Sequence, residues 1–449
     1  MLLNVSRTGV VYKAAFYLGV ASCTVGVSSC TGSHAVGTDL DGSYQLDNGL
    51  TVVLRPLPRS DRAAVVVLFN LGNVHDPVGQ SGRAHLLEHL YATSATATSA
   101  ARDMNQLVQR YGGQFNMQTG YDYTVIAGVV GADTVEEELK NAAMRMSGLT
   151  ISEGDLEREI PRILSELKNM YGGIPALAGI NHVRNRLNAI PSGGRYGGAD
   201  EHLEAMSVDE LQDVWRVYYK PNNATLAVAG GFDVAEVWDA IDRHFGSIPA
   251  GKESPPKAPA GKGPTGTVSR VGVSPVVPDA SPVVAMGYAA PRPVSELYAP
   301  FLIVVSRLLA EVQGRFTPGK PPPVYFTPLD DGSVIVLQSE LSDADRAESA
   351  LNGLDERLET ALTAELSRAD KQRTLNTMGM LGTVEIPSAM WRQNVYGLAF
   401  SAGRRLQLGI DGEALRKAIR ETTDADMARL ASSVFAPSRR VAVVVEVAK

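Results

Sequence analysis

The residues best suited to chemistry in this sequence form one pentapeptide, His-Leu-Leu-Glu-His, at positions 85–89. In a helix, residues four apart lie on the same face, so His85 and His89 would point the same way. Two imidazoles in this arrangement can bind one zinc ion and leave coordination positions open. Glu88 would lie near that face, where it could accept a proton from a water. The order of these residues is the reverse of the commoner His-Glu-x-x-His.

An ordinary helix with two histidines on its surface would give the same pattern. Leu86, Leu87 and Leu90 supply an apolar side, so a helix is expected under either interpretation. The chain has only 7 histidines in 449 residues, so a chance match to the motif is uncommon. This scarcity favours the zinc interpretation.

A catalytic zinc needs a third protein ligand, usually from a different element. The stretch 155–170 is predicted to be a helix, because four apolar residues recur at helical spacing: Ile160, Ile163, Leu164 and Leu167. Glu159 and Glu166 are seven residues apart, which is two helical turns, so they would share another face of this helix. A solvated helix face is the usual place for glutamates, and this stretch alone leaves both interpretations open.

Several further stretches resemble one family of enzymes. Residues 46–54 resemble its opening strand, 72–82 the approach to its zinc helix, and 112–124 the strand beside its site. Residues 218–233 resemble the end of its first domain. The family is the pitrilysin/insulinase family of inverted-zincin peptidases, nearest the short-chain branch that includes the mitochondrial processing peptidases. The resemblance is close over the first half of the chain and loose over 283–449.

The resemblance implies a role for each residue that matches the family's site. In that family the third zinc ligand is a Glu a little over seventy residues beyond the second His, and Glu166 lies 77 residues after His89. The family's supporting carboxylate lies two turns earlier, which corresponds to Glu159 and would orient a ligand or the water. Glu88 corresponds to the general base. Asn116 corresponds to a residue that helps to hold the substrate backbone.

The resemblance also implies an α+β fold of two similar domains, each an antiparallel sheet flanked by helices, facing each other across a peptide chamber. Strand and helix patterns alternate in both halves of the sequence, as such domains require. We expect a tether at 31–43, a zinc-binding peptidase domain at 44–250 and a second, homologous domain without zinc at 283–449. Residues 251–282 are rich in Pro, Gly, Lys and Ser and are predicted to be a linker.

The second domain departs from the family pattern. Active single-chain members usually carry an Arg and, seven residues later, a Tyr that assist at the substrate carbonyl. Tyr325 matches the Tyr, but Pro318 occupies the Arg position, and Arg315 is the nearest candidate. Arg315 and Tyr325 could equally be ordinary loop residues. Some bacterial relatives divide the site between two chains, so the resemblance implies a homologous partner subunit.

The N-terminus has the features of an export signal. An apolar run at about 14–29 follows basic residues and is too short to span a bilayer comfortably, which predicts a signal peptide at 1–30. The two cysteines, Cys23 and Cys30, each end a stretch that resembles a bacterial lipobox. We expect a lipid anchor, with Cys30 leaving the longer apolar run, and a periplasmic location in the bacterial cell envelope. An ordinary cleaved signal or a short anchor is the alternative.

Composition is that of a globular protein, with 44% hydrophobic and 20% charged residues. The net charge is −7 and no basic block occurs, which argues against nucleic acid as a partner. The sequence therefore predicts a zinc endopeptidase acting on peptides or unfolded segments. One alternative is a non-catalytic assembly or peptide-binding subunit that retains a zinc site. Another is an unrelated zinc hydrolase.

Overall fold

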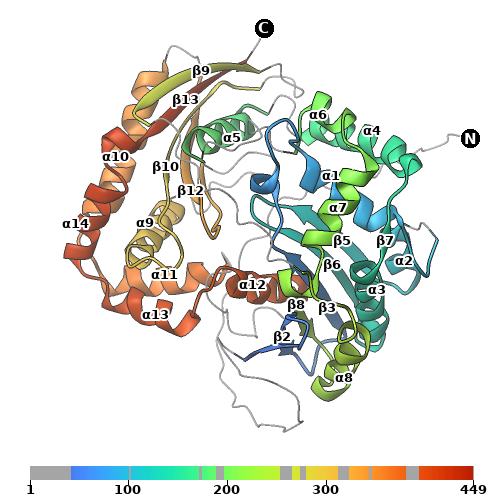
Figure 1. Cartoon of the computed structure of the whole chain (residues 1–449). Helices are drawn as coiled ribbons and strands as arrows, with labels where there is room; N and C mark the ends of the chain where they lie inside the picture. The colour runs from blue at the N-terminus through green and yellow to red at the C-terminus, as the bar shows by residue number, and fades with distance from the viewer. Residues whose placement is uncertain are drawn as a thin grey trace, which may run out of the picture.

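The structure is a computed structural model that describes residues 42–100, 103–170, 174–188, 197–252, 265–273, 280–311, 323–342, 346–380 and 394–447. The predicted signal peptide with Cys23 and Cys30, most of the predicted tether, and Arg315 lie outside these residues. The described elements form two halves, each built on one β-sheet (Figure 1). Among the described helices, none combines the length and the apolar character needed to cross a membrane.

The first half contains a six-stranded sheet in which one neighbouring pair, β2 with β8, is parallel and the other pairs are antiparallel. In spatial order the strands are β1 (Ser43–Gln45), β2 (Thr51–Pro56), β8 (Ala224–Gly230), β3 (Arg62–Phe69), β6 (Thr124–Gly131) and β5 (Gln114–Thr119). The central strands β3 and β8 are apolar along nearly their whole length because both faces of the sheet are covered. Strand β5 forms one edge.

Most helices of the first half lie on one face of this sheet (Figure 1). They are α1 (Arg83–Thr93), α2 (Met104–Arg110), α3 (Val135–Ser147), α4 (Glu153–Met170), α6 (Asp200–Glu204), α7 (Val208–Tyr218) and α8 (Val234–Phe245). A small two-stranded ladder joins β4 (Ala95–Thr96) to β7 (Leu149–Thr150). The histidine pentapeptide falls inside α1, as predicted.

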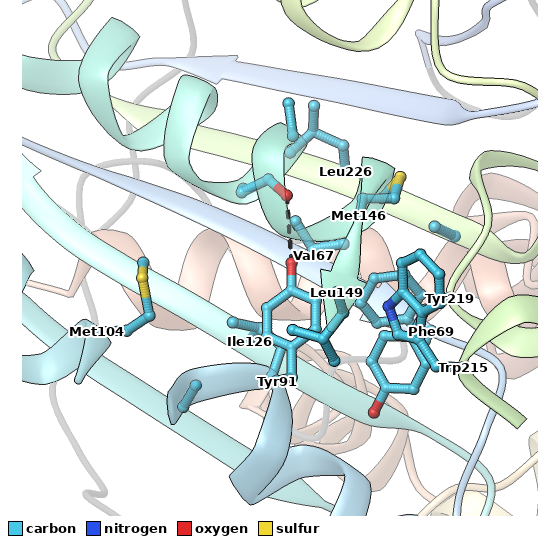
Figure 2. Packing of buried hydrophobic residues seen from close by; sticks show 14 of the residues in the cluster. Val67, Phe69, Tyr91, Met104, Ile126, Met146, Leu149, Trp215, Tyr219 and Leu226 are labelled. Carbon is cyan, nitrogen blue, oxygen red and sulfur yellow. Dashed lines mark hydrogen bonds between the residues drawn. The ribbon is translucent and has the colours of Figure 1, made fainter. Parts of the chain in front are cut away.

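Helix α1 is enclosed by the core of the first half. Every residue from Ala84 to Ala92 is buried. The Tyr91 ring stacks on Tyr219, with ring centroids 5.4 Å apart, and meets Phe69 edge-on at 6.0 Å. Figure 2 shows this aromatic group, together with the bond that the Tyr91 hydroxyl donates to the Ala142 carbonyl at 3.2 Å. These contacts fix the rotation of α1, and hence the direction of its polar side chains.

The second half contains a five-stranded sheet in the order β11 (Val324–Phe326), β12 (Val334–Glu340), β10 (Val283–Ala289), β13 (Val441–Val447) and β9 (Thr267–Val273). Its pairs are antiparallel except for β13 with β9, which is parallel. One face is covered by α9 (Tyr298–Glu311), α10 (Ala347–Thr363), α11 (Arg368–Met380), α13 (Gly412–Glu421) and α14 (Asp424–Ser433). The expected α+β fold with two helix-flanked sheets is confirmed.

Strand β9 lies inside the stretch 251–282, which the sequence predicts to be a linker. It pairs with β13 over seven residues at the edge of the sheet. Its side chains are alternately exposed and partly buried, with Arg270 and Gly272 on the exposed side. An edge strand of this composition lacks the apolar run by which a central strand is recognised. The linker prediction therefore missed an element of the second sheet.

Two helices cover the sheet of the opposite half. Helix α5 (Pro175–Asn188) packs on the second sheet and α12 (Val395–Gln407) on the first, and both lie between the halves in Figure 1. Gly403 of α12 permits close contact, because a Cβ there would lie 2.5 Å from Leu68 Cδ1. The domain bounds predicted from the sequence place α5 in the first domain and α12 in the second, whereas α5 packs on the second sheet and α12 on the first. Those bounds remain predictions.

Candidate metal centre

Helices α1 and α4 bring together the three residues predicted as zinc ligands. One ligand atom from each of His85, His89 and Glu166 lies within 4.8 Å of the others. His89 Nε2 is 3.5 Å from Glu166 Oε2, and His85 Nε2 is 4.0 Å from Glu166 Oε1. The two imidazoles are buried, whereas the Glu166 side chain is 39% exposed. The cluster therefore combines two fixed nitrogens with a carboxylate that can adjust.

The other ring nitrogen of each histidine has an oxygen acceptor. His85 Nδ1 lies 3.2 Å from the Gly197 carbonyl, and His89 Nδ1 lies 3.3 Å from Glu159 Oε2. We assign the proton of each neutral ring to Nδ1 from these contacts. In that tautomer Nδ1–H donates to the oxygen and the Nε2 lone pair faces Glu166, as a metal ligand requires.

Glu159 lies beside His89, where its carboxylate contacts Nδ1; its role in supporting a bound metal stays a prediction. Its carboxylate also accepts bonds from Arg158 Nε and Arg162 Nη1, both at 3.1 Å. Burial alone would raise the pKa of Glu159, but the bond with His89 and the charge of Arg162 outweigh it and lower the pKa to about 2. Glu159 is therefore ionised at any pH at which the protein would work.

The same carboxylates act on the protonation of His89. Burial alone would lower its pKa, but hydrogen bonds with Glu159 and Glu166 raise the pKa to about 9. A zinc ion can bind only the deprotonated nitrogen, so metal binding and proton binding at His89 compete.

Glu88 is buried on the same helix, between the two histidines in sequence, and is 4% exposed. Its Oε2 accepts a hydrogen bond of 2.5 Å from Thr119 Oγ1 at the end of β5. This bond fixes one carboxylate oxygen beside the metal cluster. Sequence reasoning did not single out Thr119, although it lies in the stretch 112–124 that was matched to the strand beside the site.

Two further buried groups hold the ends of α1, and sequence reasoning missed both. At the N-terminus, the Asp76 carboxyl accepts bonds from the Gly82 and Ala84 amides at 2.9 and 3.0 Å. At the C-terminus, Arg145 Nη1 of α3 donates to the carbonyls of Tyr91 and Ser94 at 2.5 and 3.0 Å. A cation suits the C-terminal end of a helix dipole. An acidic residue shortly before an apolar helix is the sequence signal that could have revealed Asp76.

The structure places Asn116 away from the metal cluster. Side chains alternate along a strand, and Thr119 faces Glu88, so Asn116 faces the opposite side of the sheet. There its side chain forms a hydrogen bond with Tyr396 of α12. A contact between Asn116 and substrate stays a prediction.

Tyr325 lies on β11 of the second sheet. Its hydroxyl accepts a bond from Arg184 Nη2 at 2.6 Å and another from Thr327 Oγ1 at 2.9 Å. Burial would raise the pKa of Tyr325, but the positive charge of Arg184 outweighs it and lowers the pKa below its usual value. A role for Tyr325 in substrate binding also stays a prediction, as does that of Arg315.

A cluster of candidate metal ligands on two helices, with a buried glutamate between the histidines, is the arrangement of a two-half, inverted-zincin type of protein. Comparison with known families agrees. The family described as "Insulinase (Peptidase family M16)" matches residues 51–171, and "Peptidase M16 inactive domain" matches 205–339. The chain belongs to this pitrilysin/insulinase family of peptidases, as the sequence predicted.

Individual relatives carry peptidase names. A zinc protease of Rickettsia bellii is 25% identical over 210 residues, which are 47% of this chain and 51% of the relative. The beta subunit of the mitochondrial-processing peptidase of Saccharomyces cerevisiae is 25% identical over 232 residues, 49% of this chain and 47% of the relative. The chain thus spans about half the length of these curated relatives.

A solved structure supports the fold over nearly the whole chain. The crystal structure of a protease from Helicobacter pylori superposes with a TM-score of 0.75 at 20% identity. The superposition covers 90% of this chain and 98% of that one. Since the identity is low, this likeness concerns the fold.

Proposed function

We propose that this protein is a zinc metalloendopeptidase that hydrolyses peptides or unfolded polypeptide segments. The convergence of His85, His89 and Glu166 around a site beside Glu88 is the observation that carries the proposal. Relatives that are named zinc proteases support it.

The donor set fits zinc. A tetrahedral ion with bonds of about 2.0–2.1 Å places its ligand atoms roughly 3.4 Å apart. The distances of 3.5 and 4.0 Å from the histidine nitrogens to the Glu166 oxygens are close to this value, and the partly exposed Glu166 has room to adjust. Three protein ligands are typical of catalytic zinc sites, whereas structural sites usually have four.

The chain's own residues then have distinct roles. A bound zinc would polarise the scissile carbonyl and make a nearby water more acidic. Glu88 accepts the proton of the water and passes it to the leaving amine. Thr119 holds the Glu88 carboxylate in place. Glu159 and the Gly197 carbonyl fix the imidazoles through Nδ1, which keeps both Nε2 atoms directed toward the metal.

Strand β5 is the element on which we place the substrate. Among the described strands it is the last in the order of the first sheet, and an extended peptide could add along its outer edge as a further strand. Thr119 ends β5 and contacts Glu88. A peptide paired along β5 would therefore present its backbone near the base, and recognition would depend on backbone more than on side chains.

The proposal includes a homologous partner subunit and an envelope location. Pro318 stands where the family usually has Arg, so a second chain would supply the missing donor to the substrate carbonyl. One relative is named as a subunit, which supports such an assembly. The lipid anchor on Cys30 or Cys23 and the periplasmic location rest on the leader sequence alone. To test the partner, hydrolysis by the purified chain alone is compared with hydrolysis after its closest encoded relative is added.

A non-catalytic, peptide-binding subunit is the second candidate. The match of 205–339 to "Peptidase M16 inactive domain" and Pro318 favour it. The presence of Glu88 beside a complete set of three ligands favours the peptidase, because a binding subunit has no need of a base.

The deciding experiment changes the base and keeps its shape. Glu88→Gln should retain about one zinc per chain and bind peptide, while turnover of an unfolded peptide falls at least about a hundredfold. His89→Ala should lose zinc, and the exposed Glu157→Gln on α4 is the matched control. Near-normal hydrolysis by Glu88→Gln would exclude Glu88 as the base. A wild type that cleaves no unfolded peptide, alone or with its partner, would contradict the peptidase proposal and favour the binding-subunit alternative.

A further inference from the structure

The loop Gly120–Tyr123 joins β5 to β6. Two consecutive residues in it, Tyr121 and Asp122, contact the half built on the second sheet, and Tyr123 contacts α12 between the halves. Its backbone is a tight turn, in which the Gly120 amide donates to the Tyr123 carbonyl at 2.7 Å. The Asn73 and Val74 amides donate to the carbonyls of Gly120 and Tyr121 at 3.1 and 2.9 Å. The loop is therefore a rigid connection at the end of β5.

Tyr121 is the first of the three. It is 4% exposed and forms a small apolar cluster with Leu329 of the second half and Val74 of the first. The guanidinium of Arg184 lies 3.5 Å from the centre of the Tyr121 ring and 5.1 Å from that of Tyr325. Arg184 belongs to α5, the helix that covers the second sheet. The Tyr121 ring thus packs between Val74 of the first half and residues attached to the second sheet.

Asp122 and Tyr123 complete the contact. Asp122 Oδ2 accepts the Asp330 amide at 2.8 Å, and its Oδ1 accepts Arg404 Nη2 in a part-buried ion pair. Arg404 is 3% exposed, also donates to the Pro328 carbonyl at 3.3 Å, and lies 4.5 Å from the centre of the Tyr123 ring. We call Tyr121–Tyr123 with these partners the interhalf joint.

The interhalf joint is one residue away from the support of the proposed base. Only Gly120 separates Tyr121 from Thr119, whose hydroxyl bonds Glu88 Oε2. Because the Gly120 amide is bonded to the Tyr123 carbonyl, a movement of Asp122 within this tight turn would be transmitted through Gly120 to Thr119. The metal ligands have a different support, because α1 is held at both ends by Asp76 and Arg145.

We propose that the half without metal ligands positions the base Glu88 through the interhalf joint and Thr119. Asp122, Arg404 and Thr119 are therefore positioning residues. This inference rests on the proposed peptidase function for its kinetic consequence, but the placement of Glu88 can be measured without it. It gives the second half a task that does not depend on any contact with substrate.

The first test separates the base from the metal. Asp122→Asn removes the charge that Arg404 and the Asp330 amide bind, and keeps the size of the side chain. We expect kcat to fall tenfold to a hundredfold, because a misplacement of roughly 1 Å can cost about a hundredfold. KM and zinc affinity should change less than threefold. Arg292→Gln is the matched control, because Arg292 makes an exposed ion pair with the side chain of Asp330.

The second test asks whether the effect passes through Thr119. Thr119→Val should lower kcat tenfold or more, and Thr119→Ser, which keeps the hydroxyl, should restore it. If the joint acts through Thr119, the double variant with Asp122→Asn should be no slower than the slower single variant. Effects that multiply, or an unchanged kcat in Asp122→Asn, would overturn the proposal. If Asp122→Asn fails to fold, Arg404→Lys replaces it in the same comparison.

A structural readout keeps this inference separate from the proposed function. Crystal structures of the wild type and of Asp122→Asn are compared at Glu88. We expect loss of the bond between Thr119 Oγ1 and Glu88 Oε2, with His85 and His89 unmoved. That result supports the joint even if the wild type cleaves no peptide. A Glu88 carboxylate in the same position in both structures would refute it, whatever the activity.

Discussion

The support that Glu159 gives to His89 leads to a quantitative prediction for zinc affinity. Glu159→Gln keeps the size of the side chain and an oxygen that can accept the Nδ1 proton at 3.3 Å. It removes the negative charge, so a charge-assisted hydrogen bond becomes a neutral one. A charge-assisted and a neutral hydrogen bond differ by about 1–1.5 kcal/mol. Since about 1.4 kcal/mol corresponds to a tenfold change in affinity, zinc binding should weaken about tenfold. Mutation of a residue that hydrogen-bonds to a metal ligand typically weakens metal binding by about 10- to 100-fold.

The effect should depend on pH in a stated direction. Glu159 helps to raise the pKa of His89 to about 9, so below that pH zinc must displace a proton in the wild type. Glu159→Gln weakens this proton binding as well as zinc binding. The two effects oppose each other at pH 7, whereas at pH 9, near the pKa of His89, proton competition is at most about twofold and the loss of zinc binding dominates. We therefore expect a tenfold or larger weakening at pH 9 and a smaller one at pH 7.

The measurement is a competition titration against a chelator of known affinity, at fixed free zinc, from pH 7 to pH 9. Glu157→Gln is the control, because Glu157 is an exposed residue of the same helix. Loss of the Glu159 charge should change the stability of the protein little through its ion pairs with Arg158 and Arg162, because these side chains are 41% and 54% exposed. A zinc affinity of Glu159→Gln within twofold of the wild type at pH 9 would refute the role given to Glu159.

The remaining predictions concern the pH dependence of zinc binding, the packing of α12 and the leader sequence. The zinc affinity of the wild type should fall roughly fiftyfold from pH 9 to pH 7, approaching about tenfold per pH unit below about pH 8, because one proton leaves His89 as zinc binds; a flat titration would contradict this. Gly403→Ala should lower the free energy of unfolding by about 1–3 kcal/mol, because its Cβ would lie 2.5 Å from Cδ1 of the buried Leu68. Gly353→Ala in α10 places its Cβ where no neighbouring atom lies within 4 Å, so it should raise the free energy of unfolding by about 0.5–1 kcal/mol. Equal shifts in the urea midpoint of the two variants would contradict the packing of α12. Radiolabelled fatty acid should be attached to Cys30, so Cys30→Ala should abolish labelling. Label retained by Cys30→Ala but lost in Cys23→Ala would instead assign the lipid anchor to Cys23.

The sequence was sufficient to predict the residues of the metal cluster, for two separate reasons. His85 and His89 share a helix face, and that relation depends only on local helix geometry. Glu166 lies on another helix, and its selection depended on the spacing of a known family. The structure brings all three within one cluster. Helix periodicity by itself could not have chosen Glu166 over Glu159, because both lie on the same face.

What the sequence did not predict is tertiary in origin. The Gly197 carbonyl contacts His85 across 112 residues, and Thr119 contacts Glu88 from a neighbouring element. Neither contact can be recognised in the sequence. Every residue has a backbone carbonyl, and Thr is common in strands whatever its contacts. Likewise, the apolar side of α12 predicts that the helix is buried, but not which of two apolar sheets it covers.

Helices α5 and α12 each cover the sheet of the opposite half, and this arrangement limits how a partner chain can complete the site. Residues of the first sheet such as Val66 and Ala227 are buried under α12, and residues of the second sheet such as Ala285 are buried under α5. Either half alone would expose one apolar sheet face, so the two halves must fold as one unit. A homologous partner of the proposed kind, if built in the same way, would join as a complete two-half chain. It can add donors near the substrate, whereas the placement of Glu88 is fixed within this chain.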